Sequence, residues 1–168
     1  MTLAARLLAL DEAGARALNE LTRRTPGGQR IAQTAAGTLA GGEVLLMGWL
    51  AVRGHRQAAL RMLLAVGAIY AASEAIGLAI ARQRPFVRLN EVQELLSHHP
   101  ARSFPSRHVA SAVAMASVAR PVDPRIASLM GSLAAVLAVS RVAAGLHYPS
   151  DVLGGLVLGL LIARASRI

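Results

Sequence analysis

Long apolar segments separated by short polar turns dominate the chain after residue 29. Residues 30–52 and 57–81 each contain enough apolar residues to span a bilayer as a helix. Three more apolar segments follow at 108–119, 125–144 and 150–163. The segment at 108–119 is too short for a complete crossing, because about 20 helical residues are needed to span the hydrocarbon core. The pattern therefore predicts an all-α integral membrane bundle of five helices.

The first 22 residues carry a different, amphipathic pattern. Apolar residues recur at steps of three and four, and charged residues fill much of the remainder: Leu3, Leu7, Leu10, Gly14, Ala17 and Leu21 against Arg6, Asp11, Glu12, Arg16 and Glu20. This periodicity predicts a helix that lies either in the membrane interface or on the protein's own surface. The breaker sequence at 22–28 ends it, which divides the chain into an amphipathic helix with its linker (1–29) and a membrane-embedded domain (30–168).

Composition supports the membrane assignment. Hydrophobic residues make up 54% of the chain and charged residues only 16%, which is too little polar surface for a soluble domain of 168 residues. The net charge of +9 comes entirely from arginine, but the arginines are scattered and only five residues are aromatic. We therefore expect membrane lipids and a phosphate group as partners, and no nucleic acid. The lack of cysteine excludes disulfides, thiolate catalysis and cysteine-based zinc sites.

Helix alternation places the amino-terminal region, the polar loop at 82–107 and the turn at 145–149 on one face of the membrane. The opposite face carries six arginines: Arg53, Arg56, Arg120, Arg125, Arg164 and Arg167. Cytoplasmic segments are enriched in arginine and lysine. The first face holds as many arginines, but several of them belong to the motifs described below. The distribution therefore favours a cell-membrane protein whose polar loop faces the extracytoplasmic side.

Arginine, histidine and aspartate follow one another at short intervals near the end of the chain. Five residues separate Arg141 from His147, and three separate His147 from Asp151. A guanidinium can hold phosphate oxygens, an imidazole can attack phosphorus, and a carboxylate can fix the imidazole tautomer. Pro149 suits the first position of a helix, which would place Asp151 in the first turn, within reach of the His147 ring. The spacing therefore points to a phosphoryl-transfer site.

Two further groups of polar residues stand in the 82–107 loop. Arg84 precedes Pro85, and Ser106 and His108 flank the start of the apolar segment at 108–119. Ser106 suits a helix N-cap, where the free amides of the first turn and the helix dipole attract an anion. His108 could protonate a departing oxygen, because the ordinary pKa of histidine lies near neutrality.

Together these residues resemble the three-part signature of the type-2 phosphatidic acid phosphatase superfamily, which also contains the vanadium haloperoxidases. The signature reads lysine, six residues, Arg-Pro; then Pro-Ser-Gly-His; then Ser-Arg, five residues, His, three residues, Asp. The third part is matched throughout by Ser140, Arg141, His147 and Asp151. The second is matched by Pro105, Ser106 and His108, with Arg107 in place of glycine, and the first only by Arg84 and Pro85.

The resemblance implies a role for each matched residue. His147 would be the nucleophile that forms a phosphohistidine, Asp151 would orient it, and His108 would protonate the leaving group. The phosphate oxygens would be bound by three side chains: Arg84, Arg141 and Ser106. This mechanism implies neither a metal nor any other cofactor.

One position departs from the signature, since Gly77 replaces the family's lysine two helical turns before the Arg-Pro pair. Arg107 could supply the missing charge as a further phosphate-binding residue, because a guanidinium can stand in for an ammonium. The alternative is that Arg107 faces lipid headgroups or solvent. Glu74 either contacts an arginine of the site or makes a structural hydrogen bond between helices. His98 and His99 are either loop surface or substrate contacts; adjacent histidines on a loop without an acidic residue nearby in sequence make a poor metal site.

The residues and the resemblance predict a membrane phosphatase that acts on a lipid phosphate or diphosphate. A polyprenyl (isoprenoid) phosphate or diphosphate is the favoured substrate, because compact bacterial members that act on such carriers have a similar RPF…SFPS-x-H stretch. Phosphatidic acid or phosphatidylglycerol phosphate is the alternative lipid. A lipid phosphotransferase and a vanadate-dependent oxidoreductase are the alternatives of another class. The sequence does not specify an oligomeric state.

Overall fold

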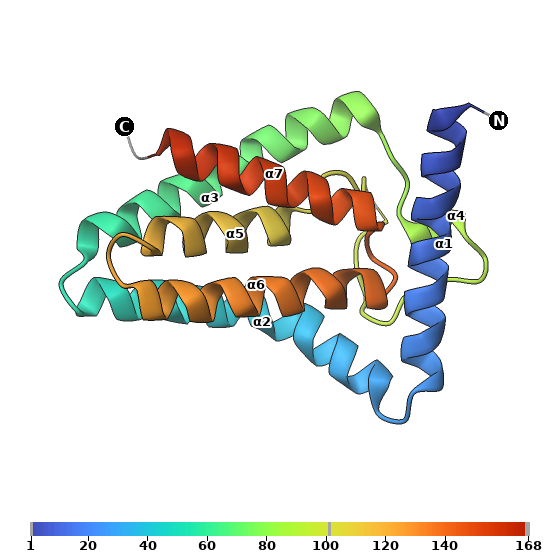
Figure 1. Cartoon of the computed structure of the whole chain (residues 1–168), viewed down its shortest axis with the longest axis horizontal. Helices are drawn as coiled ribbons and strands as arrows, with labels where there is room; N and C mark the ends of the chain where they lie inside the picture. Colours follow the sequence, from blue (N-terminus) through green and yellow to red (C-terminus); the bar gives the residue numbers. More distant parts are fainter. Residues whose placement is uncertain (1, 101, 167–168) are drawn as a thin grey trace.

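The computed structural model describes residues 2–100 and 102–166, and the secondary structure within them consists of α-helices. The helices, drawn in Figure 1, are α1 (Leu3–Arg24), α2 (Gly28–Val52), α3 (Arg56–Ile80), α4 (Pro85–Arg88), α5 (Arg107–Ala119), α6 (Pro124–Ala143) and α7 (Pro149–Ala165). The all-α prediction is confirmed, and each predicted helix is present with ends close to those expected. The sequence pattern does not predict α4, a single turn. Of the arginines expected on the far face, Arg167 lies outside the described residues.

Three segments are long and apolar enough to cross a membrane: α2 (Gly28–Val52), the segment Arg56–Arg88 that contains α3 and α4, and α6 (Pro124–Ala143). α7 has 17 residues and α5 has 13, so the helix predicted at 108–119 is short, as expected. Large apolar side chains cover the outside of the bundle, among them Leu45 and Leu63, which are 75% and 57% exposed. Such a surface fits a protein surrounded by lipid.

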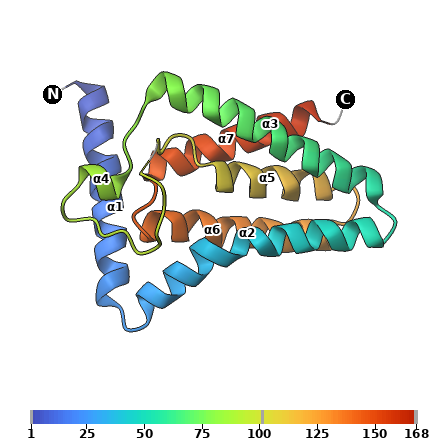
Figure 2. The same ribbon diagram turned by 180° about the vertical axis from the view of Figure 1, so that it is seen from behind.

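The short helix α5 runs through the middle of the bundle, between α3 and α7 on one side and α2 and α6 on the other (Figures 1 and 2). α7 approaches it through two glycines. A Cβ atom at Gly155 would lie 2.6 Å from the carbonyl oxygen of Ser106, and one at Gly159 would lie 2.4 Å from that of Ala110. The close approach therefore requires glycine at both positions, and it holds the first turn of α5 beside the first turn of α7.

The amphipathic helix α1 crosses one end of the bundle instead of running along it (Figures 1 and 2). The face that packs on the bundle is small and polar, with Ala15 and Asn19 fully buried. Asn19 Nδ2 donates to the carbonyl oxygens of Gln93, at 3.0 Å, and Ala143, at 2.9 Å. The leucines of another face remain exposed: Leu3, Leu7 and Leu10. The helix thus packs on the protein and still presents an apolar face, and its place in the membrane interface stays a prediction.

The polar chain between α4 and α5 lies across the same end of the bundle as α1 (Figure 2). It is anchored there by apolar burial of Leu89, Val92 and Leu95. The amide of Leu95 also donates to the carbonyl oxygen of Ala144, in the α6–α7 turn, at 3.1 Å. The loop, the α6–α7 turn and the start of α5 consequently meet at one end of the bundle.

Candidate active site

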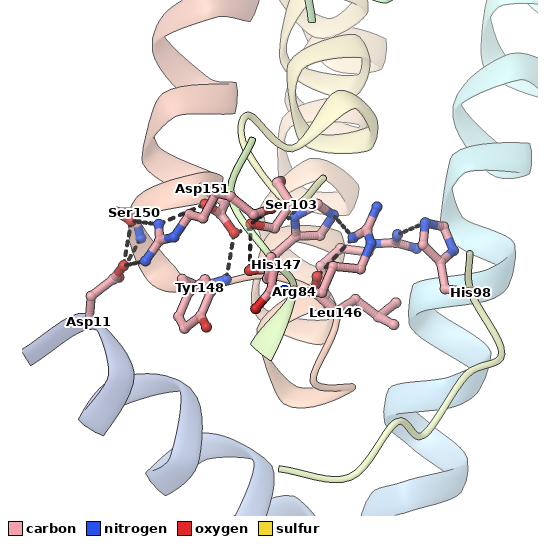
Figure 3. Close-up of polar contacts among 12 residues, drawn as sticks. Asp11, Arg84, His98, Ser103, Leu146, His147, Tyr148, Ser150 and Asp151 are labelled. Carbon is pink, nitrogen blue, oxygen red and sulfur yellow. Dashed lines mark hydrogen bonds and ion pairs between the residues drawn. The ribbon is translucent and has the colours of Figure 1, made fainter. Parts of the chain in front are cut away.

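Three residues that the sequence singles out, Arg84, His147 and Asp151, lie close together at this end of the bundle (Figure 3). Arg84 Nη1 lies 3.4 Å from His147 Nε2, and Arg141 Nη2 lies 3.4 Å from His98 Nε2. The ring of His98 is in turn 6.2 Å from the ring of His108, centroid to centroid. Five segments therefore contribute to one site: the turns beside α4 and α7, the α4–α5 loop, the last turn of α6 and the first turn of α5.

The α6–α7 turn directs His147 into the protein. Gly145 adopts φ +77°, and a Cβ atom there would lie 2.5 Å from the carbonyl oxygen of Gln93, so the turn requires glycine. His147 is 2% exposed. Its Nδ1 lies 2.8 Å from the carbonyl oxygen of Ser103. A carbonyl can only accept, so Nδ1 carries the proton and Nε2 is left with a lone pair beside Arg84.

The contact with Ser103 changes the interpretation of Asp151. Asp151 lies in the first turn of α7, after Pro149, as the sequence predicts, and it is fully buried. Its Oδ2, however, is 3.7 Å from His147 Nδ1, beyond hydrogen-bond distance. Oδ2 accepts from the amide of Tyr148 at 2.8 Å, and Oδ1 accepts from Arg82 Nη1 at 2.8 Å. In this structure the carbonyl of Ser103 holds the imidazole tautomer, and Asp151 acts on the ring through space.

The charge of His147 is set by its surroundings. Burial, together with the cations Arg141 and Arg84, lowers the pKa of its imidazole from 6.5 to about 4, and Asp151 opposes the shift. The buried ring is therefore neutral at pH 7, as a nucleophile must be.

Two buried guanidiniums flank the site. Their hydrogen bonds go to neutral carbonyl oxygens, so no negative charge in the part of the chain that the structure describes compensates their positive charge. Arg84 is 3% exposed and donates to the carbonyl oxygens of Leu146, at 2.8 Å, and His99, at 3.1 Å. Arg141 is 1% exposed and donates to the carbonyl oxygen of Ala36 at 3.3 Å. Among the residues described, neither has a carboxylate within 4.0 Å. Buried charge of this kind is costly unless an anion binds to it.

Ser106 adds a hydrogen-bonding group to the site at the start of α5. Ser106 is the N-cap residue, as predicted, but its hydroxyl makes no capping hydrogen bond. That oxygen is buried and has no hydrogen-bond partner in the described part of the chain. The backbone amide of Ser106 donates to the carbonyl oxygen of Asp151 at 3.0 Å, which ties α5 to α7. An anion between the arginines and this helix start would meet a free hydroxyl and the free amides of the first turn.

The space beside Gly77 is filled by a residue that the sequence analysis does not single out. A Cβ atom at Gly77 would lie 3.3 Å from Arg102 Nε and 3.4 Å from the carbonyl oxygen of Phe104. Arg102 also pairs with Glu74. Arg107 contacts the same carboxylate at a longer distance, with its Nη1 3.9 Å from Glu74 Oε2. Glu74 therefore contacts two arginines near the site, and Arg102, rather than Arg107, covers the position of the missing lysine.

The sequence motifs do not identify two further residues of this region, Arg82 and Asp11. Arg82 Nη2 pairs with Asp11 Oδ2, on α1, at 2.5 Å, while its Nη1 contacts Asp151. No sequence interval links Asp11 to this site, because the contact depends on how α1 crosses the bundle.

In the described part of the chain, no group of three or more His, Cys, Asp or Glu side chains is placed to hold a metal ion.

Comparison with known proteins gives the family. The family model of the PAP2 superfamily matches residues 58–168, about two thirds of the chain. This chain belongs to the PAP2 superfamily. The family that the motifs resemble is therefore confirmed. Helices α4 to α7 and almost all of α3 lie in the matched range, whereas α1 and α2 lie outside it.

Relatives and solved structures agree with this assignment. YbjG of Escherichia coli is 32% identical over 123 residues, which cover 71% of this chain and 61% of YbjG. Undecaprenyl-diphosphatase BcrC of Bacillus subtilis is 34% identical over 87 residues, 52% of this chain and 45% of BcrC. The chain thus spans about half the length of these curated relatives.

Two crystal structures are similar over nearly the whole chain. LpxE of Aquifex aeolicus superposes with a TM-score of 0.78 and 26% identity, over 91% of this chain and 92% of LpxE. A transmembrane PAP2-type phosphatidylglycerolphosphate phosphatase of Bacillus subtilis superposes with a TM-score of 0.73 and 26% identity, over 99% of this chain and 86% of that one.

Proposed function

We propose that the chain is a membrane lipid phosphatase that hydrolyses a polyprenyl diphosphate or phosphate through a phosphohistidine. The observation that carries the proposal is the pairing of a neutral, oriented imidazole with two uncompensated buried guanidiniums at Arg84 and Arg141. Such a site suits a phosphoryl group, which carries its charge on oxygens that guanidiniums hold well. The preference for a polyprenyl diphosphate is supported by the similarity to undecaprenyl-diphosphatase BcrC.

In the first step, His147 Nε2 attacks phosphorus while Nδ1 keeps its hydrogen bond to the Ser103 carbonyl. The bond between nitrogen and phosphorus forms as the bond to the leaving oxygen breaks, and His108, which is protonated while the anionic substrate is bound beside it, gives that oxygen its proton. The non-bridging oxygens lie against Arg84, Arg141 and the free Ser106 hydroxyl. In the second step, His108 takes a proton from water, the water oxygen attacks phosphorus, and phosphate leaves with His147 restored.

Asp151 assists by charge. Attack makes the His147 ring positive, and the Asp151 carboxylate lies 3.7 Å from Nδ1, where it stabilises that charge. Arg102 takes the place of the absent family lysine, since its side chain crosses Gly77. Arg107 remains an expected contact of the phosphate or of a lipid headgroup, held near the site by Glu74.

A cavity of about 250 Å³ beside the site has room for the first few carbons of the lipid. His108 lines it at the end nearest the site. The other lining residues include the polar Glu43, Tyr70 and Ser111 and apolar side chains of α2, α3 and α5: Val44, Met47, Leu63, Val66 and Met115. A leaving group protonated by His108 would therefore already have its first carbons among apolar side chains. We place α2, α3, α5, α6 and α7 in the membrane, with the site at the extracytoplasmic surface and the leucines of α1 in the interface.

A second lipid class is supported by the structural comparison. The phosphatidylglycerolphosphate phosphatase of Bacillus subtilis shares the fold over 99% of this chain, so phosphatidylglycerol phosphate or phosphatidic acid is the alternative substrate. In either case the same residues transfer the phosphoryl group, and the cavity beside His108 decides which lipid fits.

The proposed function is tested by phosphate release from a panel of pure lipids in detergent: undecaprenyl diphosphate and monophosphate, phosphatidic acid and phosphatidylglycerol phosphate. We expect the largest kcat/KM with a polyprenyl substrate, unchanged activity in EDTA, and inhibition by vanadate, which mimics the transition state. The His147→Ala protein is the control for contaminating phosphatases. Release at the wild-type rate by this variant, or no release by the wild type from any of the four lipids, would overturn the proposal.

A further inference from the structure

The amino-terminal helix α1 reaches the active site through a single carboxylate. Asp11 Oδ2 lies 2.5 Å from Arg82 Nη2, and Arg82 Nη1 donates to Asp151 Oδ1 at 2.8 Å. Arg82 therefore bridges a carboxylate of α1 and the carboxylate next to the His147 ring. α1 lies outside the range that the family model matches, so no role at the site is assigned to it.

Ser150 fixes Asp11 in this position from the α7 side (Figure 3). Its backbone amide donates to Asp11 Oδ1 at 2.8 Å, and its hydroxyl donates to Asp11 Oδ2 at 2.5 Å. The same hydroxyl accepts from Arg82 Nη1 at 2.6 Å. Asp11 thus binds the first turn of α7, where Asp151 also lies, and orients Arg82 at the same time.

The three charged side chains form a largely buried group. The side chains of Asp11, Arg82 and Asp151 are 9%, 17% and 0% exposed, and the guanidinium carbon lies 3.8 Å from the centre of the Tyr148 ring. The group contains two negative charges and one positive charge. Asp11 binds one amino group of the Arg82 guanidinium, so the cation is shared between two carboxylates. The charge of Asp151 is therefore only partly neutralised and can still attract the His147 ring.

We infer that Asp11 is a positioning residue of the active site, through which α1 orients Arg82 and keeps Asp151 able to stabilise the charged His147 ring. This inference rests on the proposed phosphatase function. Without the charge on Asp11, Arg82 turns toward Asp151 and neutralises it. Attack by His147 then slows, whereas the arginines that bind the phosphate are untouched.

The test compares Asp11→Asn with Glu12→Gln in detergent-purified protein. Both variants remove one carboxylate from α1, but in the described part of the chain Glu12 pairs with Arg16 and Arg88 and not with Arg82. We expect Asp11→Asn to lower kcat about tenfold with KM within about twofold, an effect of the size of one lost charged hydrogen bond. Single-turnover formation of the phosphoenzyme should slow by the same factor. Asp11→Glu, which restores the charge, should recover part of the rate, while Glu12→Gln should behave like the wild type.

A kcat for Asp11→Asn equal to that of Glu12→Gln, or a change confined to KM, would overturn the inference and leave the proposed function standing. If the wild type itself releases no phosphate, the proposed function fails instead. Should Asp11→Asn not remain monodisperse, Asp11→Glu and Glu12→Asp are compared in the membranes of the producing cells. Both keep their charge and change length by one methylene, and only the first should lower kcat.

Discussion

Replacing Asp151 by asparagine separates two ways in which a carboxylate can assist a histidine. If Asp151 held the Nδ1 proton, its loss would permit the wrong tautomer and cost about 10⁴ in kcat, as in a serine-protease triad. In this structure the carbonyl of Ser103, 2.8 Å from Nδ1, holds the tautomer, and asparagine leaves that contact intact. The attraction between the carboxylate and the charged ring is lost, together with the ion pair between Asp151 and Arg82.

The size of that attraction follows from the geometry. Asp151 Oδ2 is 3.7 Å from His147 Nδ1. Opposite charges about 4 Å apart attract by about 4 kcal/mol at an effective dielectric constant near 20. Arg82 Nη1, 2.8 Å from Oδ1, offsets part of it. We therefore expect Asp151→Asn to lose about 2–4 kcal/mol of transition-state stabilisation, or about 30–1,000-fold in kcat.

The assay is steady-state phosphate release by purified Asp151→Asn, with Asp123→Asn as the matched control. Asp123 caps α6 at the other end of the bundle by accepting from the amides of Arg125 and Ile126, and asparagine is an equally good cap. The control should retain wild-type kcat. A loss of 10⁴ or more in Asp151→Asn, with an unfolding temperature like that of the control, would refute the role of the Ser103 carbonyl.

Two other predictions follow from the contacts around the site. Arg102→Ala should lower kcat/KM by about 10–150-fold, the value of one charged hydrogen bond, and adding Gly77→Lys should restore part of it, because the lysine then occupies the space that Arg102 vacates. A larger loss in Arg107→Gly than in Arg102→Ala, with no recovery by Gly77→Lys, would assign the role to Arg107. Burial and the nearby Arg141 lower the pKa of His98 from 6.5 to about 4, so below pH 6.5 the unfolded chain takes up the proton more readily than the folded one. The unfolding temperature should therefore fall as pH drops from 6.5 toward 4, and less steeply in His98→Gln; equal slopes in both proteins would contradict this shift.

Much of the fold could be predicted because every helix except the single turn α4 is defined by a local pattern of apolar residues. The short length of α5 follows directly from its apolar segment, and the place of Asp151 follows from Pro149 at the start of α7. The candidate site residues could be singled out for the same reason, since motif intervals of a few residues are set by single turns, and their roles stay predictions. Their convergence on His147 needed the fold itself.

What the sequence could not predict depends on contacts between distant segments. Ser103 acts through its backbone carbonyl, which has no side-chain signature. Asp11 meets Arg82 only because α1 crosses the end of the bundle. Arg102 fills the space of the missing lysine because the loop returns over Gly77, a path that no periodicity in the loop defines.

The central claim is that His147 Nε2 becomes covalently phosphorylated. The most direct measurement is a rapid acid-free quench of the His108→Ala protein with a lipid diphosphate labelled at its terminal phosphate, followed by proteolysis and mass spectrometry at neutral pH. We expect acid-labile label on the peptide that contains His147, in less than one turnover, and none in His147→Ala. Phosphate release without any labelled intermediate, or label on another residue, would contradict the claim.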